Sequence, residues 1–202
     1  TETSAGTSNL VINVGSGETA AFGNITAANS FTSGTDTVTI NGSTGNETIT
    51  GPNVASTISG GNGTDVLTGG TSNDILNGGD GGDSLTGGTG NDTYRFNTND
   101  VDSGESITEA SSGGTDVISI VTTTDFANMS AASFNEIEVI EFSGANQTGT
   151  FTGLQLTGET LSLTETSAGT SNLVINVGSG ETAAFGNITA ANSFTSGTDT
   201  VT

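Results

Sequence analysis

Four aspartates recur at every ninth position of the chain, at Asp65, Asp74, Asp83 and Asp92. Ionised carboxylates only accept hydrogen bonds, so a regular row of them is suited to holding a hard cation through oxygen ligands. The chain has no cysteine and no histidine, which removes the usual zinc and copper sites and any nucleophile–base pair built on those residues. Cation binding through oxygen is therefore the chemistry that this spacing favours.

The aspartates belong to a nine-residue sequence repeat. Residues 60–95 read GGNGTDVLT GGTSNDILN GGDGGDSLT GGTGNDTYR. The glycines are complete only from Gly60 onward, and GSTGNETIT and GPNVASTIS before it are degenerate copies in the same phase. One large apolar residue recurs at the same spacing, at Ile40, Ile49, Ile58, Leu67, Leu76, Leu85 and Tyr94.

Each repeat predicts a tight turn followed by a short strand. Residues 66–68 can extend with the Leu67 side chain on one side of the strand and its neighbours on the other. The six residues before them must reverse direction, and paired glycines allow the positive φ angles that a tight turn requires. Two repeats then form one coil. Stacked coils bring the apolar residues into two facing internal columns, with Ile49, Leu67 and Leu85 in one and Ile58, Leu76 and Tyr94 in the other.

The same stacking places Asp65 and Asp83 at one edge of the coils, and Asp74 and Asp92 at the other. Adjacent strands lie about 4.8 Å apart, so carboxylates at this spacing repel one another unless a cation lies between them. Backbone carbonyls can complete the roughly six to eight oxygens that Ca²⁺ takes, whereas Mg²⁺ requires a small octahedron and keeps its waters. We therefore expect calcium within each aspartate pair. The candidate carbonyl donors are Gly61, Gly63, Gly79 and Gly81.

The nonapeptide resembles the repeat of a known protein family. GGNGTDVLT is similar to the repeats-in-toxin (RTX) nonapeptide G-G-x-G-x-D-x-U-x, where U is a large apolar residue. The match is complete at residues 60–68 and 78–86, whereas Tyr94 fills the apolar position of the fourth copy and Ser72 replaces the third glycine of the second. The resemblance covers about residues 42–120, because residues 91–120 resemble the segment that often follows RTX blocks. It implies a right-handed parallel β-roll that folds outside the cell when it binds calcium.

The degenerate copies depart from the pattern. Glu47 stands where an aspartate is expected, and Ser56 stands at the next such position without a charge. A calcium site between Glu47 and Asp65 is left open by the sequence, and one between Ser56 and Asp74 is not expected.

Further carboxylates follow the last nonapeptide. Residues 100–104 resemble the start of an EF-hand loop, but the twelfth position is Ser111 and no helices flank it. The interpretations that remain are extra calcium ligands at the end of the roll or a solvated acidic loop. The candidate ligands are Asp100, Asp102, Glu105 and Asp116, in a cluster that also contains Glu109. Glu136, Glu138 and Glu141 alternate along an expected strand, which is typical of its solvent-facing side.

Composition limits the remaining classes. Of 202 residues only 30% are hydrophobic, and 22 acidic residues face a single base, for a formal net charge of −21. Such a chain lies near the boundary of disorder unless its carboxylates are neutralised. Nucleic acid is excluded as a partner because phosphates require many Lys and Arg residues. No apolar run is long enough to cross a membrane.

Outside the nonapeptides, short alternating segments rich in Thr and β-branched residues predict further strands. An apolar period of 3.6 residues occurs only over a turn or two around residues 124–134. The expected fold is therefore all-β, a right-handed parallel β-solenoid with at most one short helical insertion. The clearest strands outside the repeats are expected at residues 10–14, 117–121, 137–142, 154–156 and 161–163.

A second, much longer repeat is exact. Residues 1–39 recur letter for letter as residues 164–202, an offset of 163. We interpret the parent protein as a tandem array of near-identical units; the alternative is an artificial copy of the beginning. The chain is expected to divide into four segments. They are residues 1–41, the opening solenoid segment of the unit; 42–95, the calcium-binding roll; 96–163, a β-rich segment after the roll; and 164–202, the start of the next unit. At about eighteen to twenty residues per coil, and with coils about 4.8 Å apart, one unit would make about eight or nine coils.

The functional expectation is a non-enzymatic, calcium-stabilised structural and adhesive module. The resemblance implies a secreted bacterial protein of the surface adhesin, surface-layer or extracellular filament type, whose partners are calcium ions and neighbouring copies of the same unit. The alternative is the calcium-dependent secretion and folding domain of an RTX exoenzyme whose catalytic domain lies elsewhere.

Overall fold

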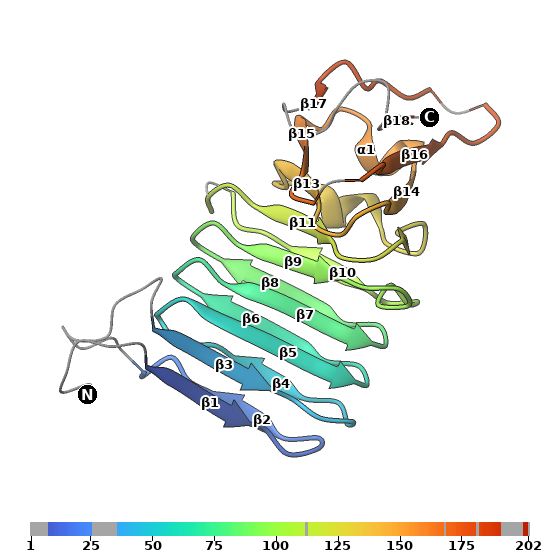
Figure 1. Cartoon of the computed structure of the whole chain (residues 1–202). Coiled ribbons are helices and arrows are strands. Elements are labelled where there is room, and N and C mark those ends of the chain that lie inside the picture. Colours follow the sequence, from blue (N-terminus) through green and yellow to red (C-terminus); the bar gives the residue numbers. More distant parts are fainter. Residues whose placement is uncertain are drawn as a thin grey trace.

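The structure is a computed structural model that describes residues 8–25, 36–111, 113–167, 169–180, 182–190 and 200–201. Within these residues the chain winds into a solenoid of stacked coils, each with one strand on either face (Figure 1). Neighbouring strands on each face pair in parallel. The predicted all-β parallel solenoid is confirmed.

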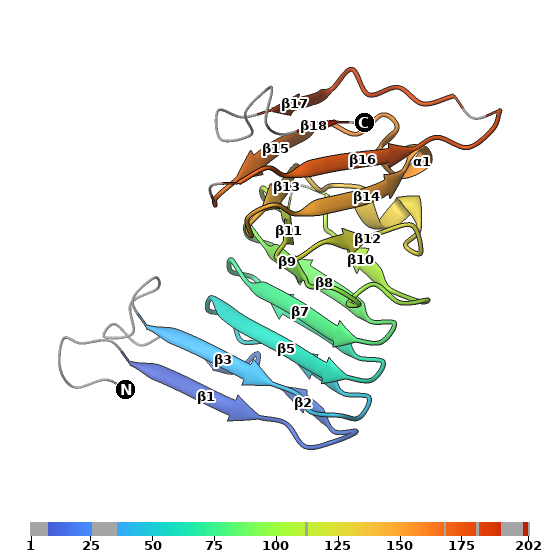
Figure 2. The same cartoon turned by 45° about the vertical axis from the view of Figure 1, so that its right-hand side comes forward.

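The odd-numbered strands form one continuous face of nine strands in chain order (Figure 2). They are β1 (Asn9–Asn13), β3 (Thr37–Asn41), β5 (Ser56–Asn62), β7 (Ile75–Asp80), β9 (Thr93–Phe96), β11 (Val117–Ile120), β13 (Val139–Phe142), β15 (Leu161–Glu165) and β17 (Ile188–Ala190).

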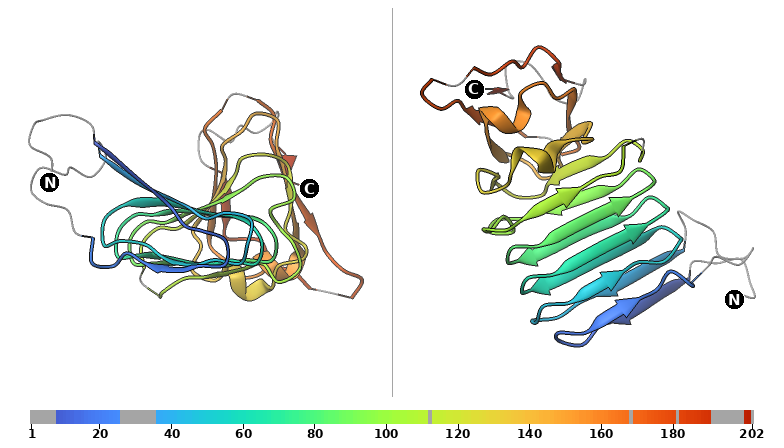
Figure 3. Two further views of the ribbon diagram at one scale, coloured as in Figure 1. Left: turned by 90° about the horizontal axis from the view of Figure 1, so that it is seen from below. Right: turned by 180° about the vertical axis from the view of Figure 1, so that it is seen from behind.

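The even-numbered strands form the other face, which is divided into two sheets. The first contains β2 (Thr19–Ala21), β4 (Thr48–Thr50), β6 (Val66–Gly70), β8 (Ser84–Gly88) and β10 (Ser106–Thr108). The second contains β12 (Thr124–Asp125), β14 (Thr148–Thr152), β16 (Asn172–Asn176) and β18 (Thr200–Val201). Seen along the axis, the coils after this division are turned relative to the earlier ones (Figure 3).

The core consists of the two predicted columns, extended at both ends. Cross-strand pairing stacks Leu67 on Leu85 in one column and Leu76 on Tyr94 in the other, and all four side chains are fully buried. The first column runs through Ile49, Leu67, Leu85 and Ile107. The second runs through Ile40, Ile58, Leu76, Tyr94, Ile118, Ile140 and Leu163.

Beyond the repeats the core widens and becomes aromatic. Phe126 stacks on Phe151 with ring centroids 4.6 Å apart, and Phe96 and Phe134 meet these rings edge-on. A short 3₁₀ helix, η1 (Ala131–Phe134), supplies Phe134 and packs against β10. It lies within the segment for which the sequence predicts a helical turn.

A second helical turn stands where the sequence predicts a strand. Residues 154–156, expected to extend, lie in the α-helix α1 (Gly153–Leu156). The reason is Gln155, whose buried amide accepts the N–H of Thr152 through Oε1 and donates through Nε2 to the carbonyls of Phe126 and Met129. Leu154 is exposed and Leu156 is buried, so the prediction of a strand from the apolar alternation of this segment is wrong.

The coils differ in length. Equivalent residues in successive nonapeptide coils are 18 apart, as for Asp65 and Asp83, whereas 28 residues separate Asn9 from Thr37 and 24 separate Asp92 from Asp116. In the described residues, fifteen strands, β1 to β15, precede the copy of β1 at β16. At two strands per coil, the 163-residue unit makes seven and a half coils, and the prediction of eight or nine is wrong.

Candidate metal centre

The four repeat aspartates lie at the entry to four consecutive strands. Asp65 and Asp83 directly precede β6 and β8 on one edge of the roll, and Asp74 and Asp92 lie just before β7 and β9 on the other. All four are at most 1% exposed. The structure therefore brings together the two pairs that the nine-residue period predicts.

On the first edge the carboxylates form a ladder along the solenoid axis. The N–H of Glu47 donates to Oδ1 of Asp65 at 2.6 Å, and the N–H of Asp65 donates to Oδ1 of Asp83 at 2.7 Å. The next rung has Glu105 in the aspartate's place, since the N–H of Asp83 donates to its Oε2 at 2.9 Å. Each carboxylate is thus oriented by the backbone of the coil before it.

The second edge carries the same ladder over a greater length. The N–H groups of Ser56 and Asp74 donate to Oδ1 of Asp74 and Asp92, both at 2.7 Å. Beyond the repeats the N–H of Asp92 donates to Oδ1 of Asp116 at 2.8 Å, and that of Asp116 to Oε2 of Glu138 at 2.7 Å. Glu138, expected on the solvent-facing side, is half-buried and ends this ladder. The sequence signal that could have identified Glu138 is its spacing of 22 residues from Asp116, which is also the spacing between Asp83 and Glu105.

The first glycine of each repeat makes room for the carboxylate. A Cβ on Gly60 would overlap Oδ2 of Asp65, and one on Gly78 would overlap Oδ2 of Asp83. Any larger residue would therefore push the carboxylate out of the turn. The first glycine of the repeat is required by the position of the aspartate and not by a positive φ.

The second and fourth positions of the repeat need glycine for a different reason. Gly79 and Gly81 have φ angles of 102° and 130°, in the region that other residues avoid. A Cβ on either would also overlap the carbonyl oxygen of the equivalent glycine one coil earlier, Gly61 or Gly63. These carbonyls, predicted as calcium donors, thus lie against the next coil; whether they coordinate an ion remains a prediction.

One carboxylate oxygen of each repeat aspartate accepts no hydrogen bond from the described residues. Oδ2 of Asp65, Asp74, Asp83 and Asp92 is buried and has no hydrogen-bond partner among the described residues. Burial without a partner disfavours the ionised form. It raises the pKa of Asp74 and of Asp83 to about 6, with smaller opposing contributions from the hydrogen bonds described above. Burial also raises the pKa of Asp65 and of Asp92.

Glu105 also has a buried carboxylate oxygen without a hydrogen-bond partner among the described residues, and its pKa is raised further than those of the repeat aspartates. Its Oε1 is buried without a hydrogen-bond partner in the part of the chain that the structure describes. Burial, together with the charges of Asp83, Asp100 and Asp102, raises its pKa to about 9. Among the carboxylates predicted after the repeats, Glu105 therefore lies on the first ladder and Asp116 on the second.

Asp100 and Asp102 have other surroundings. Oδ2 of Asp100 accepts the N–H of Asn97 at 2.7 Å and the side-chain amides of Asn97 and Asn77. These bonds anchor the loop at residues 97–100 to the repeat block. Asp102 is exposed on the same loop. Neither residue is a rung of a ladder.

Glu47 differs from the repeat aspartates because its carboxylate is already occupied. Oε1 accepts the N–H of Gly17 at 2.6 Å, and Oε2 accepts the N–H of Ser43 at 2.9 Å. Although burial opposes it, this hydrogen bonding lowers the pKa of Glu47. In this structure Glu47 ties the turn before β2 to the repeat block, and its role as a calcium ligand remains a prediction.

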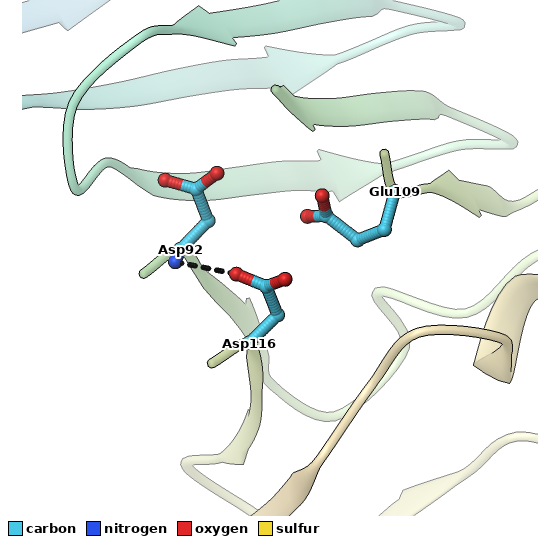
Figure 4. Close-up of side chains that lie close together, drawn as sticks. All are labelled: Asp92, Glu109 and Asp116. Atoms are coloured by element: carbon cyan, nitrogen blue, oxygen red, sulfur yellow. Dashed lines mark hydrogen bonds between the residues drawn. The ribbon is translucent and has the colours of Figure 1, made fainter. Parts of the chain in front are cut away.

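A third carboxylate joins two neighbouring members of the second ladder, where the repeat block ends. Carboxylate oxygens of Asp92, Glu109 and Asp116 all lie within 4.8 Å of one another (Figure 4). Glu109 comes from the opposite side of the coil, directly after β10, and accepts a hydrogen bond from the Tyr94 hydroxyl. That hydroxyl accepts the N–H of Gly87 at 2.7 Å. Burial raises the pKa of Glu109 to about 7. The sequence places Glu109 in the acidic cluster but does not single it out as a ligand.

The donor set fits calcium. The free oxygens are carboxylate oxygens, they are buried, and they repeat from coil to coil beside backbone carbonyls of the glycine turns. A hard divalent cation with a high coordination number satisfies such oxygens and cancels the repulsion along each ladder.

Comparison with known proteins agrees with this chemistry. Residues 59–94 match the model of the RTX calcium-binding nonapeptide repeat, in four copies. This segment is an RTX calcium-binding repeat block. Its cofactor is Ca²⁺, as the sequence predicts. No significant match was found among curated proteins or among solved structures. None of the helices in the described ranges is long and apolar enough to cross a membrane.

Proposed function

We propose that this chain is a non-enzymatic structural and adhesive module of a secreted tandem-repeat protein, either a surface protein or an extracellular filament, and that calcium holds it folded. The observation that carries the proposal is the pair of carboxylate ladders with buried, unpartnered oxygens inside the RTX repeat block. Calcium would be held by Asp65 with Asp83 and by Asp74 with Asp92.

Folding of the repeat block is unfavourable without the ion. The block fully buries only one large apolar residue in nine, so its core offsets little of the conformational entropy lost on folding. Carboxylates buried in each ladder oppose folding further. An ion that binds the folded state and not the unfolded one supplies the missing stability by mass action. Where calcium is scarce, as in the cytosol, the block stays unfolded; where it is abundant, it folds.

The exact recurrence of residues 1–39 at an offset of 163 residues supports the structural role. An array needs interchangeable units, whereas an enzyme has no such need. The solenoid is also suited to an array, because each coil contacts its neighbours alone and further coils can be stacked at either end.

The second candidate is the calcium-dependent secretion and folding domain of an RTX exoenzyme, which the RTX repeat block at residues 59–94 also suits. The sequence of the parent protein beyond residues 1–202 discriminates the two. Further 163-residue copies support the array, and a catalytic motif supports the exoenzyme.

Circular dichroism of the full chain during an EGTA–calcium titration tests the calcium dependence. We expect the β-strand signal to disappear in EGTA and to return at about millimolar calcium. A spectrum that does not respond to chelation would overturn the proposal, because folding would then not depend on the ion.

A further inference from the structure

The 39-residue segment occurs twice, and the first strands of its two copies, β1 and β16, lie toward opposite ends of the solenoid (Figures 1 and 2). Strand β1 of the first copy corresponds to β16 of the second, at an offset of 163 residues. Both copies pair with their own next segment in the same register: Asn9 lies opposite Thr37, and Asn172 lies opposite Thr200. The first strand of the segment therefore pairs in the same register with the strand that follows it by 28 residues, in two different surroundings.

The surroundings differ on the other edge of the strand. β16 pairs along its whole length with β14, from Thr148 opposite Asn172 to Thr152 opposite Asn176. β1 is the terminal strand of its sheet, and no described residue pairs with its outer edge. The same leucine is accordingly 40% exposed as Leu10 and 0% exposed as Leu173. An open parallel edge with exposed apolar side chains is a template for another strand.

We propose that the outer edge of β1 is the docking site for β14 of a second copy of this chain. The register is the one seen within the chain, with Thr148 opposite Asn9 and Thr152 opposite Asn13. The same five residues already accept β14 on that edge in their second copy, so this strand pairing requires no new backbone contact. This inference rests on the proposed structural role, because it describes how separate chains of such a structural protein join end to end.

The junction has a geometric consequence. β1 belongs to the nine-stranded face, whereas β16 belongs to the opposite face with β14. The described residues of one unit contain fifteen strands, an odd number, so each new unit begins on the face opposite to the one where the last began. At about 4.8 Å per coil, one unit advances about 36 Å, and the structural repeat is two units, about 72 Å.

In the chain of residues 1–202 the docking strand is covered by its own β16. Docking of a second chain therefore requires residues 164–202 of one molecule to leave and residues 1–39 of another to take their place. Because the two segments have the same sequence, β14 pairs with the same five residues before and after the exchange. The released segment regains conformational entropy, and the contact is head-to-tail, so it produces open filaments.

Cysteine pairs in the full chain test the docking, because the natural chain has no cysteine. Val11 corresponds to Val174, which lies opposite Thr150. T150C/V11C places the two thiols at opposite ends of one molecule, so only a docked second chain can join them. The matched control is T150C/V66C, since Val66 is 44% exposed in the middle of the solenoid. Each variant is unfolded in EGTA, refolded with calcium at high concentration, and then oxidised.

We expect T150C/V11C to form disulfide-linked oligomers in a yield well above that of the control. Equal yields of disulfide-linked oligomers in the two variants would overturn the docking proposal. A second measurement uses T150C/V174C, whose internal disulfide locks β16 onto β14. Light scattering should show assemblies for the natural chain and monomers for the locked one, and assemblies of equal size would also contradict docking. Circular dichroism on the same samples separates the two proposals: normal calcium-induced folding without assembly rejects the docking alone.

Discussion

The backbone N–H of Asp65 donates to Oδ1 of Asp83 at 2.7 Å, while Oδ2 of Asp83 is buried without a hydrogen-bond partner in the described chain. One oxygen thus positions the carboxylate, and the other is available to an ion. The hydrogen bond through Oδ1 and ion binding through Oδ2 are therefore separate roles of the Asp83 side chain, and the two can be tested independently.

Asp83→Asn tests that separation. Asparagine keeps an acceptor for the Asp65 N–H and removes the charge, so we expect calcium affinity to fall by at least about tenfold. Without calcium the variant should be more structured than the natural chain, since a buried unpaired charge is gone. Calorimetric titration and circular dichroism in EGTA measure the two effects. The control is Asp125→Asn, an exposed carboxylate outside both ladders; equal losses of affinity would show that binding is diffuse.

Gly79→Ala tests the close approach of successive coils. Its φ of 102° and the overlap of a Cβ with the Gly61 carbonyl both oppose the substitution. Gly158→Ala is a matched control, because Gly158 has a φ of 85° with nothing within 4 Å of the added Cβ. Both share the left-handed strain of about 1–2 kcal/mol, but only Gly79→Ala should shift the calcium midpoint of folding strongly upward. Similar midpoints for the two variants would mean that coil stacking tolerates a methyl group.

The pH dependence of the calcium-free chain follows from the buried carboxylates. The pKa values of Asp74 and Asp83 are raised to about 6 and that of Glu105 to about 9, mainly by burial. Between the unfolded and the folded pKa values the folded state binds more protons, so its stability falls as pH rises. In EGTA we expect more β-structure at about pH 5 than at about pH 8, and a larger response to calcium at about pH 8. A chelated chain that gains structure as pH rises would contradict this.

Glu109→Gln tests the cluster of three carboxylates on the second ladder. If Glu109 shares an ion with Asp92 and Asp116, the variant should bind one calcium ion fewer or bind the last one at least about tenfold more weakly. Equilibrium dialysis with radioactive calcium measures the number bound. Glu141→Gln is the control, since Glu141 is half-buried on β13 and accepts a hydrogen bond from Ser119. An unchanged count for Glu109→Gln would assign Glu109 to holding the Tyr94 hydroxyl alone.

The sequence by itself determined the repeat block. Because every coil there has the same length, the nine-residue period fixes which side chains stack, and this predicted the columns through Leu67 and Leu76 and both aspartate pairs. The identity of the ion followed as well, since oxygen donors without cysteine or histidine leave few choices of metal.

Only the tertiary structure decided what happens where the period ends. Coil length varies from 22 to 29 residues outside the repeats, so spacing no longer shows which carboxylate meets which backbone. Glu138 therefore proved to be a rung of the ladder, and Gln155 turned an apparent strand into a helix by satisfying carbonyls 26 and 29 residues away. The same irregular lengths give the unit a half-integral number of coils, which places two identical strands, β1 and β16, on opposite faces of one solenoid.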